Sequence, residues 1–260
     1  MKRSPRAIPH LFRQWRQVVS RIGASSRVIV FLDFDGTLAA IAARPDRVRV
    51  KPAMRRVLHK LASQKRVSVT VISGRRRTEL KRCVAVPRLN YLGLYGWERN
   101  GNEKLSSAAR ATLFRAQTLL LKELAPFPGV WIEPKHNSFS VHLLNARPRA
   151  RRGARLAVRA FLQRFAGDLQ LFENLRDVEV VPQHIPDKGA AIREWLARPA
   201  SRGALVLFFG DDLSDEPAFR AVRGGISVLV GRKRPTHARF RLRSPDEVTK
   251  ALNRIQEALP

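Results

Sequence analysis

An uninterrupted apolar run at residues 28–32 ends on the motif Asp-Phe-Asp-Gly-Thr at 33–37. Such a run predicts a strand buried on both faces, as in a parallel sheet covered by helices. Open sheets of this kind bind ligands beyond the carboxyl ends of their strands, where this motif lies. Because side chains alternate along a strand, Asp33 and Asp35 project to the same side. One carboxylate could attack an electrophile there while the other transfers a proton. A strand-end turn capped by an Asx side chain is the alternative.

The rest of the chain alternates between strand and helix patterns in its first and last thirds. This alternation is typical of a parallel, helix-covered α/β sheet. Further strands are predicted at 67–72, 89–94, 204–209 and 226–230, and helices at 52–63, 75–83, 187–196, after 214 and at 246–258.

The middle third changes character and predicts a small α+β unit inserted into the parallel pattern. Its elements are a helix at 106–124, a hairpin at 130–133 and 138–144, a helix at 150–165 and strands at 169–173 and 178–181. The predicted fold class is α/β, a Rossmann-like parallel-sheet core with an inserted α+β cap domain. We expect the core domain at 27–103 and 184–260 and the cap at 104–183.

The N-terminal segment 1–26 contains apolar residues at helical spacing between positions 9 and 22. They predict an amphipathic helix. A helix lying on a membrane surface or binding a partner is one alternative, and docking on the core before the first strand is the favoured interpretation.

The chain is strongly basic, with 50 Lys and Arg against 21 Asp and Glu and a formal net charge of +29 among its 260 residues. This charge can attract anionic substrates, and it raises nucleic-acid binding as an alternative. The cations are spread along the chain, with few aromatic residues interleaved, which argues against a dedicated nucleic-acid site. The single cysteine, Cys83, excludes an intrachain disulfide and is expected to pack in the core. No segment has the length and apolarity of a membrane span or a signal peptide, so we expect a cytoplasmic protein and no membrane partner.

Two later motifs suit a phosphate ester. Ser73-Gly74-Arg75 follows the predicted strand 67–72, where a hydroxyl and the backbone N–H groups of a helix start can face an anion. Lys188 follows Asp187 at the start of another helix. A cation is unfavourable there unless its side chain reaches a phosphate or the attacking carboxylate of the first motif. The alternatives are a serine that only caps its helix and a solvated lysine.

A second apolar strand, 204–209, also ends in carboxylates: Asp211, Asp212 and Asp215. Three clustered carboxylates are unexpected in so basic a chain unless they bind a cation. Hard carboxylate oxygens with a few waters are the ligands that Mg²⁺ prefers, so Mg²⁺ is the predicted cofactor.

These motifs together resemble those of the haloacid dehalogenase superfamily of phosphatases, over residues 28–252. The resemblance implies that Asp33 is a nucleophile that forms an aspartyl-phosphate and that Asp35 is the acid and base. Lys188 and Ser73, with Gly74 and Arg75 beside it, would hold the phosphoryl group. The implied Mg²⁺ ligands are Asp33, Asp35 through its backbone carbonyl, Asp211 and Asp212, with Asp212 and Asp215 holding waters or orienting Lys188.

The cap motifs resemble those of the trehalose-6-phosphate phosphatase family. Glu133 and Lys135 are similar to its Glu-x-Lys hairpin, and Glu179 lies in a Val-Glu-Val-Val-Pro stretch like that of the family. The resemblance implies that these three side chains bind sugar hydroxyls. A surface ion pair between strands is the alternative for Glu133 and Lys135.

The chain departs from the family pattern in two places. Leu94 and Tyr95 replace an Asn-His pair, and Leu143 or Leu144 stands where an arginine is usual. Tyr95 could contact a sugar ring or pack against the cap. The expected partner is therefore a small sugar phosphate, with trehalose 6-phosphate favoured, and the protein is expected to be a monomer.

Two other functions remain open. The first is a phosphatase for another sugar phosphate, such as sucrose 6-phosphate or a glycosyl-glycerate phosphate. The second is an inactive, basic nucleic-acid-binding module, against which the retained Asp33, Asp35, Lys188 and Asp211 argue.

Overall fold

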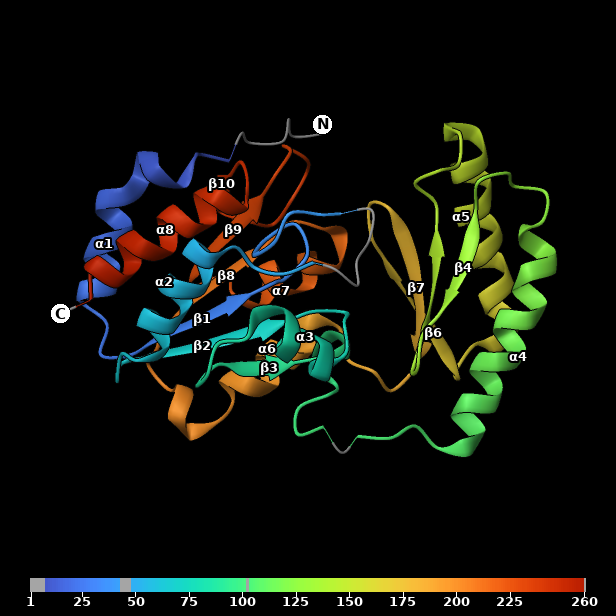
Figure 1. Cartoon of the computed structure of the whole chain (residues 1–260), viewed down its shortest axis with the longest axis horizontal. Coiled ribbons are helices and arrows are strands. Elements are labelled where there is room, and N and C mark those ends of the chain that lie inside the picture. The colour runs from blue at the N-terminus through green and yellow to red at the C-terminus, as the bar shows by residue number, and fades with distance from the viewer. Residues whose placement is uncertain (1–7, 43–47, 102, 260) are drawn as a thin grey trace. The chain divides into compact units, whose positions relative to one another are not determined.

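The computed structural model describes residues 8–42, 48–101 and 103–259, and the first seven residues of the predicted segment 1–26 lie outside this part. The chain divides into two compact units (Figure 1). The core unit combines Met1–Asn102 with Pro186–Pro260, and the cap unit is Glu103–Ile185.

Six parallel strands form the sheet of the core unit, in the order β10-β9-β8-β1-β2-β3. Strand β1 is at the centre, hydrogen-bonded to β2 on one side and to β8 on the other. This confirms the predicted parallel sheet. The strands are β1 (Val28–Leu32), β2 (Val67–Ile72), β3 (Asn90–Leu92), β8 (Leu205–Gly210), β9 (Ile226–Val230) and β10 (Phe240–Leu242).

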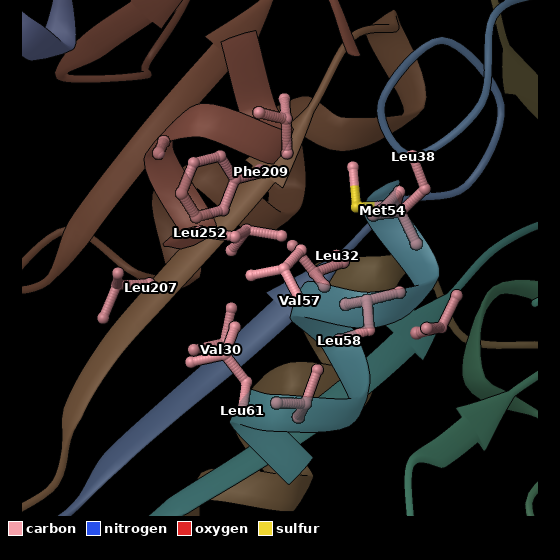
Figure 2. Packing of buried hydrophobic residues seen from close by; sticks show 14 of the residues in the cluster. Val30, Leu32, Leu38, Met54, Val57, Leu58, Leu61, Leu207, Phe209 and Leu252 are labelled. Carbon is pink, nitrogen blue, oxygen red and sulfur yellow. The ribbon is translucent and has the colours of Figure 1, made fainter. Parts of the chain in front are cut away.

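Helices cover both faces of this sheet, because alternate residues of β1 are buried in two different clusters. Val30 and Leu32 pack with residues of α1, α2, α3 and α8, as Figure 2 shows around β1 and α2. Ile29 and Phe31 pack with residues of α6 and α7 on the other face. The helices of the core unit are α1 (Trp15–Gly23), α2 (Pro52–Ala62), α3 (Arg77–Val84), α6 (Lys188–Leu196), α7 (Glu216–Ala221) and α8 (Pro245–Glu257).

The N-terminal helix packs on the core unit. A 3₁₀ turn, η1 (Leu11–Gln14), leads into α1, and Leu11, Val18 and Ile22 are buried. The guanidinium of Arg254 lies 4.6 Å from the centre of the Phe12 ring. Cys83 is also buried in this cluster, as expected.

The cap unit is an antiparallel sheet in the order β4-β5-β7-β6 with two helices. Val141, Val178 and Val180 are fully or almost fully buried, as are Leu120 of α4 and Val158 of α5. The unit therefore has its own apolar core between sheet and helices. Its elements are α4 (Ser107–Leu124), β4 (Trp131–Pro134), β5 (Phe139–His142), α5 (Pro148–Leu162), β6 (Leu169–Glu173) and β7 (Asp177–Pro182).

Two short segments differ from the sequence prediction. The predicted strand 89–94 ends as β3 at Leu92, because the backbone then turns back on the loop after β2. The N–H groups of Leu94 and Tyr95 donate to the carbonyl oxygens of Arg75 and Ser73, both at 2.9 Å. Strand β10 was not predicted, because its three residues are too few to show a period.

Candidate active site

The chain reverses its direction across the core sheet between β1 and β8. Strands β1, β2 and β3 follow one another to one edge, whereas β8, β9 and β10 follow one another to the opposite edge. At such a switch point the loops after two neighbouring strands diverge and leave room for a ligand. Asp33 follows β1 and Asp211 follows β8, so the two carboxylates meet there.

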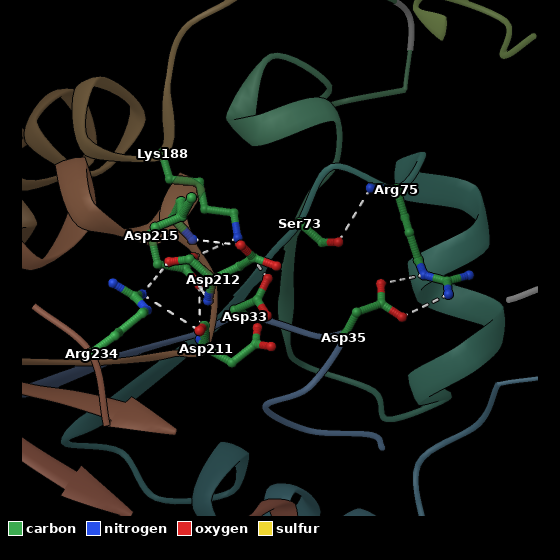
Figure 3. Close-up of polar contacts among 10 residues, drawn as sticks. Asp33, Asp35, Ser73, Arg75, Lys188, Asp211, Asp212, Asp215 and Arg234 are labelled. Carbon is green, nitrogen blue, oxygen red and sulfur yellow. Dashed lines mark hydrogen bonds and ion pairs between the residues drawn. The ribbon is translucent and has the colours of Figure 1, made fainter. Parts of the chain in front are cut away.

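A buried ion-pair cluster occupies this position (Figure 3). The ammonium of Lys188 donates to Oδ1 of Asp33 and to Oδ1 of Asp215, each at 2.6 Å. All three residues are at most 5% exposed. Lys188 is the first residue of α6, and Asp187 caps this helix by accepting from the N–H of Ala190 at 2.6 Å. The lysine therefore contacts the proposed nucleophile, and the solvated alternative is wrong.

The electrostatics of the cluster follow from burial and from the surplus of carboxylates. Burial raises the pKa of Asp33 to about 7, with a further increase from Asp215, although Lys188 opposes this. Burial also raises the pKa of Asp211, and Asp33 and Asp215 add to the increase. Burial alone would lower the pKa of Lys188, but Asp215 and Asp33 together raise it. The lysine is therefore a permanent cation.

The donor set fits a divalent metal ion. Asp33, Asp211 and Asp215 each offer a carboxylate oxygen, and these atoms lie within 4.8 Å of one another. Three carboxylates and one ammonium carry a net charge of −2, which a divalent cation would neutralise. Close approach of the two loops supports the same position. A Cβ at Gly36, whose φ is +82°, would lie 2.1 Å from Oδ2 of Asp211.

Asp215 and Asp212 also organise the loop after β8. Oδ2 of Asp215 accepts from the backbone N–H groups of Asp211 and Asp212, both at 2.9 Å. The Asp212 carboxylate accepts from the N–H of Leu213 and forms a capping box with Asp215. Asp212 is outside the three-carboxylate group, and its role at the metal stays a prediction.

Asp35 points away from Asp33 and toward helix α3 (Figure 3). The guanidinium of Arg75 donates from Nε and Nη2 to the two Asp35 oxygens, each at 2.7 Å. Arg75 also pairs with Glu79 and lies 5.1 Å from the centre of the Phe34 ring. The side chain of Arg75 is 10% exposed and that of Asp35 is 38% exposed. Arg75 is therefore engaged by two carboxylates, whereas the sequence suggested contact with substrate.

Ser73 lies in the turn between β2 and α3. Its hydroxyl accepts from the N–H of Arg75 at 3.2 Å, and the residue is buried. Ser73 does not cap α3, because the N-cap residue is Arg76. A carboxylate oxygen of Glu98 accepts from the N–H of Arg77 at 2.6 Å and serves that end of the helix instead. The hydroxyl of Ser73 thus belongs to the turn, not to a helix cap.

Tyr95 is buried in the core unit against the turn that carries Ser73. A Cβ at Gly74 would lie 2.8 Å from the Tyr95 ring, so the glycine is what lets the ring pack there. Leu94 and Tyr95 have φ values of +43° and +60°, an unfavourable region for residues other than glycine. The other departure falls on Leu143 or Leu144, of which Leu143 is fully buried and Leu144 is 57% exposed.

In the cap unit, the predicted sugar-binding residues form two pairs across strands. Lys135 lies 3.2 Å from Glu179, and the hydroxyl of Ser138 donates to the same Glu179 oxygen at 2.7 Å. Glu133 bonds Nε2 of His142 at 2.7 Å. Burial alone would lower the pKa of Lys135, but the charges of Glu179, Asp177 and Glu133 together raise it.

Sequence reasoning missed Arg234 and Glu98 and gave Asp215 a minor place. Arg234 donates to the carbonyl of Asp212 at 2.6 Å and pairs with Glu216, so it supports the loop after β8. No local motif marks either residue, because each acts on a segment remote in sequence. The sequence placed Asp215 in the acidic cluster, and the structure brings its carboxylate to Lys188.

The sequence matches the model of the trehalose-phosphatase family over residues 31–246. The chain belongs to this family. Together with the parallel core sheet and the separate antiparallel sheet, this confirms the predicted haloacid dehalogenase fold class.

Curated relatives agree with this membership. The chain is 35% identical over 252 residues to a trehalose-phosphate phosphatase from Mycobacterium leprae, covering 88% of this chain and 58% of the relative. It is 34% identical over 245 residues to the Mycobacterium tuberculosis protein of the same name, covering 88% of this chain and 61% of the relative. The chain therefore spans about three fifths of the length of these relatives.

Solved structures share the fold. The C-terminal domain of trehalose-6-phosphate phosphatase from Candida albicans has a TM-score of 0.82 at 21% identity, covering 98% of this chain and all of that chain. A sucrose-phosphatase from Synechocystis has a TM-score of 0.58 at 17% identity, covering 88% of this chain and 98% of that chain. In the described part of the chain, every helix is too short or too polar to cross a membrane.

Proposed function

We propose that this protein hydrolyses trehalose 6-phosphate to trehalose and inorganic phosphate, with Mg²⁺ as its cofactor. One observation carries the proposal: a buried Asp33–Lys188–Asp215 cluster lies beside Asp211 at the switch point of the core sheet. The names of relatives that are 34–35% identical support the choice of substrate.

In the first step, an oxygen of Asp33 attacks phosphorus and the bond between phosphorus and the sugar oxygen breaks. Asp35 gives a proton to the departing sugar oxygen. Since Asp35 is paired with Arg75 in the structure, its side chain must first rotate away from that guanidinium. In the second step, Asp35 takes a proton from water, the water oxygen attacks phosphorus, and the bond to Asp33 breaks. Free phosphate and the original carboxylate result.

The other residues stabilise charge on the transferred group. Lys188 is fixed by two carboxylates and stays protonated, so its ammonium can face a phosphoryl oxygen without moving a proton. The Ser73 hydroxyl and the backbone of Gly74 offer donors at the turn after β2. Asp33, Asp211 and the Asp35 carbonyl would hold Mg²⁺, with Asp212 as a further ligand. Asp212 and Asp215 would also hold waters or orient Lys188. Mg²⁺ would neutralise charge on the transferred phosphoryl group.

We further propose that the core unit is the catalytic domain and that the cap unit selects the substrate. The predicted bounds are 27–103 with 184–260 for the core and 104–183 for the cap. Glu133, Lys135 and Glu179 on the cap sheet would bind the sugar hydroxyls, the acids accepting and the lysine donating.

A substrate panel tests this proposal. Phosphate release would be measured with Mg²⁺ from trehalose 6-phosphate, sucrose 6-phosphate, glucose 6-phosphate and p-nitrophenyl phosphate. The expected result is the highest kcat/KM for trehalose 6-phosphate. An equal kcat/KM for sucrose 6-phosphate would contradict the proposed substrate, and no turnover of any ester would contradict the proposed reaction.

A further inference from the structure

The cap sheet has one apolar face and one face that is polar and aromatic. Residues alternate between faces along each strand, so the apolar set that includes Val141 and Val178 lies opposite the second set. The strand register aligns the members of this second face as neighbours across three strands. They are Trp131, Glu133, Ser140, His142, Asp177 and Glu179.

Trp131 is an exposed aromatic residue that is nevertheless held in place. Its ring stacks on the ring of His142, with centroids 4.0 Å apart and planes 17° apart. His142 is itself bonded to Glu133 at 2.7 Å. The indole is 48% exposed despite these contacts. The result is a rigid, flat surface that remains accessible and directly adjoins a carboxylate.

This combination of groups suits a sugar ring. The faces of a pyranose carry C–H groups that pack on an aromatic ring, and its edge carries hydroxyls that carboxylates and ammonium groups bind. Every second residue from 131 to 135 lies on this face, which gives a row formed by Trp131, Glu133 and Lys135. The row extends roughly 13 Å, long enough for two sugar rings placed end to end. Lys135 and Glu179 lie at one end of the row, and Trp131 lies at the other.

We propose that Trp131, backed by His142, is the surface on which the sugar ring without the phosphate stacks. This inference rests on the proposed function. It makes Trp131 a specificity-determining residue for a disaccharide phosphate over a monosaccharide phosphate.

Trp131→Ala tests the inference, with Phe114→Ala as the matched control. Phe114 is an exposed aromatic residue of the same unit, 71% exposed on α4. The expected result is that Trp131→Ala lowers the ratio of kcat/KM for trehalose 6-phosphate to that for glucose 6-phosphate by about three- to tenfold, mainly through KM. Trp131→Phe should restore most of this ratio, and Phe114→Ala should match wild type. An unchanged ratio in Trp131→Ala would overturn the inference.

A binding measurement separates this inference from the proposed function. Tryptophan fluorescence would be titrated with trehalose and with sucrose, which carry no phosphate. We expect a saturable change in the wild-type protein and in Phe114→Ala that is lost in Trp131→Phe. If the enzyme prefers another phosphate ester while this signal persists, only the proposed function fails. If neither sugar gives a signal that depends on Trp131, the inference fails whichever ester is hydrolysed.

Discussion

The two aspartates of the same motif have opposite surroundings. Asp33 is buried beside Lys188 and two further carboxylates, whereas Asp35 is partly exposed and holds the guanidinium of Arg75. A single residue between them in sequence therefore separates the proposed nucleophile, which is buried, from the proposed acid and base, which is partly exposed. These surroundings suit the proposed roles, because a nucleophile needs a fixed position and a proton carrier needs to reach two different oxygens.

Asp33→Asn should abolish catalysis and keep the fold. An amide of the same shape cannot form the aspartyl-phosphate, and Lys188 retains its bond to Asp215. We expect kcat to fall by at least ~10³-fold, measured as phosphate release, with a thermal unfolding midpoint no lower than that of the wild type. Activity within tenfold of wild type would contradict the covalent route.

Arg75→Ala should affect kcat more than KM. Without the two hydrogen bonds from Arg75, the Asp35 side chain is no longer held in one orientation near the site. A proton carrier in the wrong position should lower kcat by about 10–100-fold. Arg82→Ala, an exposed arginine on the same helix, serves as the control. A rise in KM with kcat unchanged would instead support the contact with substrate that the sequence suggested for Arg75.

Divalent metal affinity should depend on pH up to about 7. Burial raises the pKa of Asp33 to about 7, so below that pH a proton occupies one of the oxygens that would bind the metal. The affinity for Mg²⁺ should fall by about tenfold for each pH unit below 7, measured by calorimetry between pH 5.5 and 8. Asp33→Asn should show a shallower dependence, and a pH-independent affinity in the wild type would exclude Asp33 as a ligand.

At the scale of elements, helix α6 positions Lys188, the proposed catalytic lysine. Asp187 satisfies the first turn of the helix, and the next residue, Lys188, enters the buried cluster. A Cβ at Gly189 would lie 2.4 Å from the carbonyl oxygen of Pro217, so α6 packs closely on the start of α7. The N-cap contact of Asp187 and the packing of α6 on α7 together fix the position of the Lys188 ammonium.

Asp187→Ala should therefore reduce both stability and catalysis. Loss of an N-cap costs about 1 kcal/mol of unfolding free energy, and displacement of Lys188 should lower kcat as well. Ser106→Ala, which removes the N-cap of α4 in the cap unit, is matched in stability but should leave kcat unchanged. The test combines urea unfolding with steady-state kinetics, and equal kcat values in the two variants would contradict this role of Asp187.

Elements with a strong local pattern were predictable, and those that depend on distant partners were not. The apolar run of β1 and the cap helix α4 match the predicted ranges to within one residue at each end. Strand β10 exists because Phe240 and Leu242 pair with β9 and bury their side chains, which no local pattern shows. The turn at Leu94 and Tyr95 depends in the same way on the loop after β2.

At the scale of the whole molecule, the net charge of +29 should accelerate the capture of an anionic substrate. We expect kcat/KM for trehalose 6-phosphate to fall several-fold as ionic strength rises from about 0.01 to 0.15 M, because the Debye length shortens. The kcat value should change much less, since charge steering acts before binding. A kcat/KM that is independent of salt would show that the basic surface plays no part in encounter.

The sequence by itself determined the parallel core, the inserted unit and the carboxylates at the strand ends, because apolar periodicity and strand-end motifs are local. It also indicated Lys188, because a cation at the start of a helix is unfavourable without an anionic partner. Only the tertiary structure decided which groups meet. Placing β8 beside β1 brings Asp211 and Asp215 to Asp33, whereas Arg75 draws Asp35 away. Ion pairing depends on distances between segments that are far apart in sequence. These distances are fixed only by the order of the strands in the folded sheet.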